Sequence, residues 1–131
     1  MNRIIKFRAW SVSQNEMLPN VGFHPHLMMD LSGDDEYYKE NIEGRYLINP
    51  KFDNFKLMQF TGLKDKSGVD IYEGDIYHQG DVNITYTVVF KDCGFIGKQN
   101  GSNMSYAGIE YFKSKIEVIA NIYQPILTTE A

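Results

Sequence analysis

Apolar and polar residues alternate in short runs along this chain. The clearest run is residues 84–90, where Ile84, Tyr86, Val88 and Phe90 occupy every second position. Side chains two residues apart point to the same face of a β-strand. This run therefore predicts a strand on which these four side chains share one face. Other runs with strand character are residues 4–10, 57–61, 69–72, 76–78, 109–112 and 116–123.

Turn signatures separate these runs. Asp65 and Gly68 stand first and fourth in a tetrapeptide, which is the preference of a type I turn. Gly74 marks a second bend, and Asn100-Gly101 is a hairpin signal. Short strands joined by tight turns predict a mainly β fold. We expect a small antiparallel, strongly bent sheet that closes into an SH3-like barrel.

The barrel core is predicted over about residues 57–123 of a single domain that spans residues 1–131. Residues 11–20 are polar and end in Pro-Asn, so they predict a turn or a loop. Residues 21–55 are expected to form a variable excursion, which starts as an edge strand or an irregular segment. At most one short helix is expected, over residues 34–45, with a loop as the equal alternative.

Composition narrows the class of protein. The chain has 131 residues, a net charge of −4 and one cysteine, Cys93. A single cysteine cannot form a disulfide within the chain, which favours a reducing compartment. No apolar run has the length of a membrane span or of a signal peptide core. We therefore expect a cytoplasmic protein that does not associate with membranes.

Three blocks of the sequence carry a family resemblance. They are KFRAW at residues 6–10, residues 58–76, which begin MQFTGLKD and end IYEGDI, and EVIANIY at residues 117–123. Together they resemble the YopX-like family of phage and prophage proteins. The resemblance implies a small, mostly β protein encoded by mobile elements. It implies no activity or catalytic residue, and it shows no family pattern between about residues 21 and 55.

Four acidic residues cluster in the middle block: Asp65, Asp70, Glu73 and Asp75. Paired carboxylates could serve a glycoside hydrolase, or a nuclease that uses metal ions. Turn geometry explains the same residues, because Asp initiates turns and Glu73 and Asp75 flank Gly74. We interpret the cluster as turn chemistry and assign no catalytic residue.

Metal and thiol chemistry have weaker support. His24 and His26 would point to one side of an extended segment, with Asp30 or His78 as a distant third ligand. Histidines in exposed loops are commoner, so we expect neither a metal nor another cofactor. Cys93 follows Asp92, whose charge disfavours a thiolate. It is interpreted as a buried or incidental cysteine.

A basic and aromatic row lies on the first predicted strand. Lys6, Arg8 and Trp10 share the face opposite Ile5 and Phe7. Such a row could stack on single-stranded bases and contact phosphates. The net charge of −4 favours instead a covered face, on which the Lys and Arg stems lie over Trp10.

The leading functional hypothesis is a non-enzymatic module that binds another protein. A nucleic-acid-associated accessory protein and a small hydrolase or nuclease are the alternatives, and self-association through sheet edges is a further expectation. Backbone geometry and burial account for most of the middle block, including the expected core residues Leu57, Phe60, Ile71 and Ile76. The motif residues that remain for a partner are Lys64, Tyr72 and Glu73.

Overall fold

The computed structural model of the protein describes residues 4–23, 38–39, 44–49, 54–101, 105–109 and 113–124. The chain divides into two compact units. Ile4–Gln59 forms the N-terminal unit, and the chain from Phe60 onward forms the C-terminal unit. The long strand β6 (Phe55–Lys64) begins in the first unit and ends in the second. The expectation of a single domain stays a prediction.

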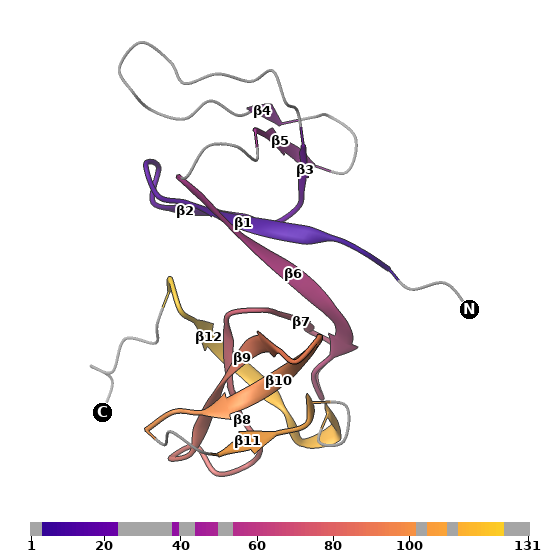
Figure 1. Ribbon diagram of the computed structural model, residues 1–131, viewed down its shortest axis with the longest axis vertical. Helices are drawn as coiled ribbons and strands as arrows, with labels where there is room; N and C mark the ends of the chain where they lie inside the picture. Colours follow the sequence, from indigo (N-terminus) through magenta and orange to yellow (C-terminus); the bar gives the residue numbers. More distant parts are fainter. Residues whose placement is uncertain are drawn as a thin grey trace. The chain divides into compact units, whose positions relative to one another are not determined.

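The N-terminal unit contains a hairpin and a small mixed sheet (Figure 1). The hairpin consists of β1 (Phe7–Ser11) and β2 (Glu16–Leu18), and β1 also pairs antiparallel with the first half of β6. In the mixed sheet β5 lies between a parallel β3 and an antiparallel β4. The mixed strands are β3 (Val21–Phe23), β4 (Tyr38–Lys39) and β5 (Tyr46–Ile48). The buried core residues are Ala9, Leu18, Val21, Ile48 and Phe55.

The turn or loop predicted over residues 11–20 is partly wrong, because Glu16–Leu18 is a strand. A tight turn brings it back onto β1: the Ser11 hydroxyl accepts a hydrogen bond from the Gln14 N–H, and Asn15 adopts a φ of +55°. Of the two alternatives after residue 20, an edge strand or an irregular segment, the described residues Val21–Phe23 form the edge strand β3. Within the predicted helix the described pair Tyr38–Lys39 is a strand, and residues 34–37 and 40–43 lie outside the described residues.

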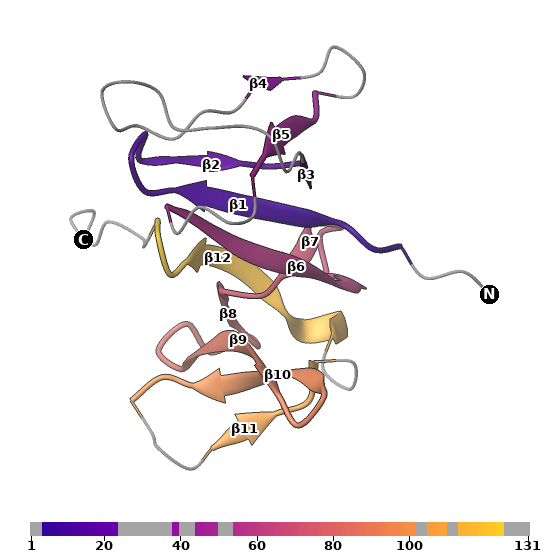
Figure 2. The ribbon, with the colours of Figure 1, turned by 45° about the horizontal axis from the view of Figure 1, so that its top comes forward.

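The C-terminal unit is built on a strongly curled antiparallel half-barrel sheet with the order β11-β10-β9-β8-β12. Figure 2 shows β10 lying between β9 and β11. Its strands are β8 (Asp75–His78), β9 (Thr85–Lys91), β10 (Gly94–Gln99), β11 (Tyr106–Ala107) and β12 (Glu117–Asn121). A short strand β7 (Asp70–Tyr72) pairs with the end of β6, and a 3-10 helix η1 (Lys113–Lys115) precedes β12.

The predicted mainly β fold with a strongly bent antiparallel sheet is confirmed. Closure into an SH3-like barrel stays a prediction. The strand expected over residues 109–112 is wrong where it can be compared: Ile109 has helical backbone, and residues 110–112 lie outside the described residues. The buried core residues of this unit are Ile71, Tyr77, Val88, Ile109 and Ile116.

Tyr77 is the largest fully buried side chain of the C-terminal core. Its ring stacks on Tyr86 with centroids 5.3 Å apart. Its hydroxyl lies against Gly97, and a Cβ at that position would overlap it. Glycine is therefore required at position 97 for the close approach of ring and backbone. Burial raises the pKa of Tyr77, with a further contribution from Tyr86, and the nearby Gln79 side chain opposes the rise.

Candidate functional site

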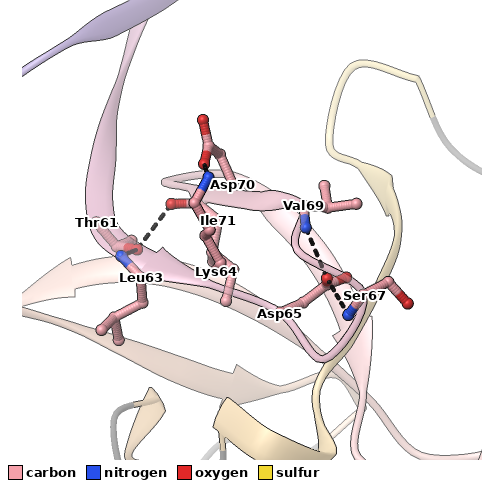
Figure 3. Close-up of polar contacts among 8 residues, drawn as sticks. All are labelled: Thr61, Leu63, Lys64, Asp65, Ser67, Val69, Asp70 and Ile71. Carbon is pink, nitrogen blue, oxygen red and sulfur yellow. Dashed lines mark hydrogen bonds and ion pairs between the residues drawn. The ribbon is translucent and has the colours of Figure 1, made fainter.

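The turn between β6 and β7 is organised around Asp65 (Figure 3). Its Oδ1 accepts hydrogen bonds from the Ser67 and Val69 N–H groups, both at 2.9 Å. Its backbone carbonyl accepts one from the Gly68 N–H at 3.0 Å, and Gly68 has a φ of +88°. This arrangement confirms the turn predicted from Asp65 and Gly68. The carboxylate also reaches β12, because Oδ2 accepts the Val118 N–H at 3.0 Å across 53 residues of sequence.

Asp65 is therefore an anchor within the fold. Only 6% of the residue is exposed. Burial alone would raise its pKa, but the N–H groups of Val118, Val69, Ser67 and Gly68 outweigh burial and lower it. The carboxylate is consequently ionised at neutral pH, and both of its oxygens accept backbone hydrogen bonds. A general acid needs a raised pKa and a proton to give, and Asp65 has neither.

The neighbouring carboxylates also bind groups of the fold. Asp75 is 2% exposed, and its Oδ2 accepts the Tyr72 N–H at 2.7 Å across the bend at Gly74. Asp70 lies 2.6 Å from the Lys64 ammonium, on the more exposed side of the turn (Figure 3). These contacts agree with the interpretation of the acidic cluster as turn chemistry.

An irregularity in the β6–β7 pairing places Thr61 in the same network. The register shifts between Phe60 and Lys64, where Gly62 adopts a φ of +93°. The Thr61 hydroxyl donates to the Ile71 carbonyl at 2.7 Å and accepts the Leu63 N–H at 3.2 Å (Figure 3). The hydroxyl thus replaces part of the ladder where the backbone leaves it. The sequence pattern predicted the strand but not this bulge.

The three residues predicted to face a partner differ in exposure. The Lys64 side chain is 61% exposed but forms the ion pair with Asp70. Tyr72 is only 8% exposed and packs on Phe60 with ring centroids 5.6 Å apart, so it belongs to the covered part of the motif. Glu73 is half-buried. Lys64 and Glu73 therefore retain accessible surface.

Burial of the motif follows the prediction for Phe60 and Ile71, which are 6% and 0% exposed, and Ile76 is half-buried. The prediction that Leu57 is a core residue is wrong, since that residue is 39% exposed. Met58 is 3% exposed instead. Neighbouring residues of a strand point to opposite faces, so only one of the two can point inward.

The basic and aromatic row lies in the N-terminal unit. Lys6 precedes β1, and Arg8 and Trp10 alternate along it with Phe7 and Ala9, as the pattern predicted. Trp10 is only 8% exposed, and Lys6 and Arg8 are half-buried. Stacking on a base requires an open ring face. The covered Trp10 fits the interpretation of the row as a covered sheet face.

His78 forms a link that the sequence did not indicate. Its Nδ1 accepts the Gly80 N–H at 3.0 Å, so the hydrogen of the neutral ring lies on Nε2. Nε2 is 3.4 Å from a Glu117 carboxylate oxygen, and the same oxygen is 3.5 Å from the Lys66 ammonium. Nδ1 therefore fixes the chain just after β8, and Nε2 faces a partner on β12. No local signal could have found this contact, because Glu117 is distant in sequence.

Of the predicted thiol and metal sites, the structure places Cys93 but not the histidine pair. Cys93 is exposed in the β9–β10 turn, where it has a φ of +67°. Of the two interpretations, the buried cysteine is therefore wrong, and the incidental cysteine stays a prediction. His24, His26 and Asp30 lie outside the described residues. Among the residues that are described, no group of three or more His, Cys, Asp or Glu side chains could hold a metal ion.

Two surface hollows can be placed in the described part of the C-terminal unit. One, of about 130 Å³, is lined by Gln79, Asp81, Ile84 and Tyr86 around the β8–β9 connection. The other is more open, about 420 Å³, and lies along the Asp65 turn. Its lining residues are Gly62, Leu63, Lys64, Asp65, Lys66 and Ser114.

Aromatic side chains are exposed at the far end of β9. Phe90 is 57% exposed and packs edge to face on Phe95, with centroids 5.2 Å apart. Tyr106 on β11 is 39% exposed, and the Lys91 ammonium lies 5.6 Å from the centre of its ring. The alternation correctly placed Phe90 on the face of Val88, which is 1% exposed. On that face, burial decreases from Val88 to Phe90, toward the β9–β10 turn.

Comparison with known proteins gives a family. The sequence matches the family described as YopX protein over residues 6–126. This chain belongs to the YopX family. The crystal structure of protein EF1440 from Enterococcus faecalis is similar, with a TM-score of 0.57 and 26% sequence identity, and the match covers 93% of this chain and 95% of that one. No curated protein matches the sequence. In the described part of the chain, no helix has the length and apolar character to cross a membrane.

The blocks that carried the resemblance take clear places in this YopX family protein. Residues 6–10 lead into β1, residues 58–76 run from β6 into β8, and residues 117–123 contain β12. The second and third blocks are joined directly by the hydrogen bond between Asp65 and Val118. Asp65 in the second block thus joins the turn after β6 to strand β12 within the C-terminal unit.

Proposed function

We propose that this YopX family protein is a non-enzymatic module that binds another protein. The observation that carries the proposal is the exposed aromatic pair at the end of β9, formed by Phe90 and Phe95. Phe90 leaves 57% of its surface in water although it packs on a second ring. Interfaces are enriched in aromatic side chains, and such residues often dominate the binding energy.

The state of the polar residues supports a non-catalytic role. Asp65 and Asp75 accept backbone hydrogen bonds, and His78 uses one ring nitrogen for Gly80 and turns the other toward Glu117. A general acid or base must be able to exchange a proton with a bound substrate. These three groups instead stabilise turns and strand pairing, which weakens the hydrolase alternative.

Nucleic acid is the less favoured partner. The chain has a net charge of −4, and phosphate contacts depend on Lys and Arg. Trp10, the ring that would stack on a base, is 8% exposed. The proposed setting is the cytoplasm of a cell that carries the phage or prophage. The single cysteine and the family resemblance support that setting.

Site-specific photo-cross-linking tests the proposal. A photoreactive residue replaces Phe90 in one variant and Ile122, which is 50% exposed, in a matched control. In cells that carry the gene, the variant at position 90 should cross-link one protein, excess unlabelled wild type should compete, and the control should not cross-link it. Phe90→Ser should abolish capture without lowering the thermal midpoint by more than a few degrees. The proposal fails if neither position captures a protein while the purified wild type turns over a substrate.

A further inference from the structure

The hollow beside the β8–β9 connection contains an unusual pair of polar atoms. Gln79 Nε2 and the Tyr77 hydroxyl are both buried, and neither has a hydrogen-bond partner among the described residues. The two groups are close enough for the Gln79 side chain to favour the ionised form of Tyr77. A buried donor without a partner is costly, so such atoms point to a missing contact.

Rotation of the Gln79 amide by half a turn would change this arrangement. The oxygen and nitrogen of an amide have nearly the same shape, so the exchange fits the same space. Oε1 would then accept the hydroxyl hydrogen of Tyr77. Nε2 would turn toward the hollow, which Gln79 lines together with Asp81, Ile84 and Tyr86. The Tyr77 hydroxyl would then be paired, and the hollow would gain a hydrogen-bond donor.

The other lining residues complete a small recognition pattern. Asp81 uses Oδ1 to accept the Asn83 N–H at 2.9 Å, which leaves Oδ2 as an acceptor for a ligand. Tyr86 and Ile84 provide an aromatic ring and an aliphatic edge. A ligand that fits must therefore be flat and carry an acceptor next to a donor. A volume of about 130 Å³ suits one side chain.

We infer that this hollow binds the carboxamide of an Asn or Gln side chain of the partner protein. The carboxamide oxygen accepts from Gln79 Nε2, its NH₂ group donates to Asp81 Oδ2, and its plane lies against Tyr86. The inference rests on the proposed protein-binding function and names the chemistry of one contact. A guanidinium has no acceptor for Gln79, and a carboxylate is repelled by Asp81. A nucleobase has the same hydrogen-bond pattern but brings phosphates toward an acidic site.

NMR titration of the full, ¹⁵N-labelled chain tests the inference with flat probes. Acetamide should shift the Gln79 side-chain NH₂ signals and the Ile84 and Tyr86 amide signals in a saturable way, with a dissociation constant on the order of 100 mM for so small a ligand. Guanidinium and acetate should bind severalfold more weakly. Gln79→Glu should reverse the order of acetamide and guanidinium, because it replaces the donor by a second acceptor.

Two further variants keep the result decisive. Asp81→Asn removes the carboxylate from an exposed turn and should weaken acetamide binding, whereas Asp92→Asn, in the exposed β9–β10 turn, should leave it unchanged. Tightest binding of guanidinium, or no saturable shift at these signals with any probe, would overturn the inference. Tighter binding of cytidine than of acetamide would replace the protein side chain by a nucleobase. Capture of a protein through position 90 that does not change in Gln79→Glu would leave the proposed function standing and remove only this contact.

Discussion

Replacement of Asp65 by asparagine tests whether the motif is held together by one carboxylate. The asparagine oxygen can still accept from Ser67 and Val69, which Oδ1 now does at 2.9 Å. Its NH₂ group then takes the place of Oδ2 and faces the Val118 N–H, which now donates at 3.0 Å. One charge-assisted hydrogen bond is lost and two donors oppose each other. A bond to a charged group contributes about 1.5–3 kcal/mol, and an unpaired buried donor costs about 1–3 kcal/mol.

We therefore expect Asp65→Asn to lower the free energy of unfolding by about 2–4 kcal/mol. Asp81→Asn is the matched control, because Asp81 accepts the N–H of Asn83 two residues on, in an exposed turn. The control should cost less than about 1 kcal/mol. Urea unfolding at pH 7, followed by circular dichroism, measures both, and amide exchange at Val118 should accelerate only in Asp65→Asn. Equal losses in the two variants would refute the reasoning.

The same variant has an expected pH dependence. The pKa of Asp65 is lowered in the folded protein from its ordinary value of 3.8. Between the folded and unfolded pKa values the unfolded chain binds more protons, so stability falls as the pH decreases through that window. The stabilisation is fully present above the unfolded pKa. The stability difference between wild type and Asp65→Asn should thus be constant near neutrality and shrink below about pH 4. A difference that grows toward low pH would contradict this assignment.

Four further substitutions have defined outcomes. Gly97→Ala places a Cβ on the Tyr77 hydroxyl and should cost about 1–3 kcal/mol in urea unfolding. Adding Tyr77→Phe to this variant should recover only part of the loss, because the ring carbon Cζ would still lie 2.8 Å from the new Cβ. Burial raises the pKa of Tyr77, so the stability that its neutral form provides is present below the unfolded value of 10.0 and lost above it; Tyr77→Phe should therefore lose less stability than wild type between pH 9 and 11, and equal losses would contradict the assignment. Lys64→Ala should cost less than about 1 kcal/mol despite the 2.6 Å ion pair with Asp70, because the Lys64 side chain is 61% exposed, and a larger loss in urea unfolding would disprove this. Trp10→Ala should cost about 3–5 kcal/mol in urea unfolding, because Trp10 is 8% exposed, and a loss below about 1 kcal/mol would contradict the covered position of its ring.

Local features of the sequence predicted more than distant ones. The turn at Asp65 and Gly68 was predictable, because the side chain that accepts and the residue with positive φ lie within one tetrapeptide. The exposure of Leu57 was not, because the inward face of β6 depends on what packs against it. The contacts of Asp65 with Val118 and of His78 with Glu117 join residues far apart in sequence, and a single sequence has no signal for such pairs.

The candidate site shows the same division. The sequence correctly predicted the turn at Asp65 and Gly68 and left Lys64 as an accessible side chain. It also chose Tyr72, which an aromatic contact with Phe60 covers. It passed over Phe90, because regular alternation predicts an inward face along the whole of β9. A side chain is buried only if it points inward and other residues also pack against it. Phe90 extends beyond the covered part of the sheet, with 57% of its surface exposed.

The Asp65 turn also bears on how a partner can bind. Strand β12 lies at one edge of its sheet, and sheet edges tend to pair with other chains. Here the Asp65 carboxylate accepts the Val118 N–H, and the Lys66 N–H donates to the Ile116 carbonyl at 3.0 Å. These two bonds occupy the backbone groups at the start of β12 that an added strand would need. A partner that reaches this part of the protein must therefore bind through side chains, which agrees with a proposed interface built from exposed aromatic residues at the end of β9.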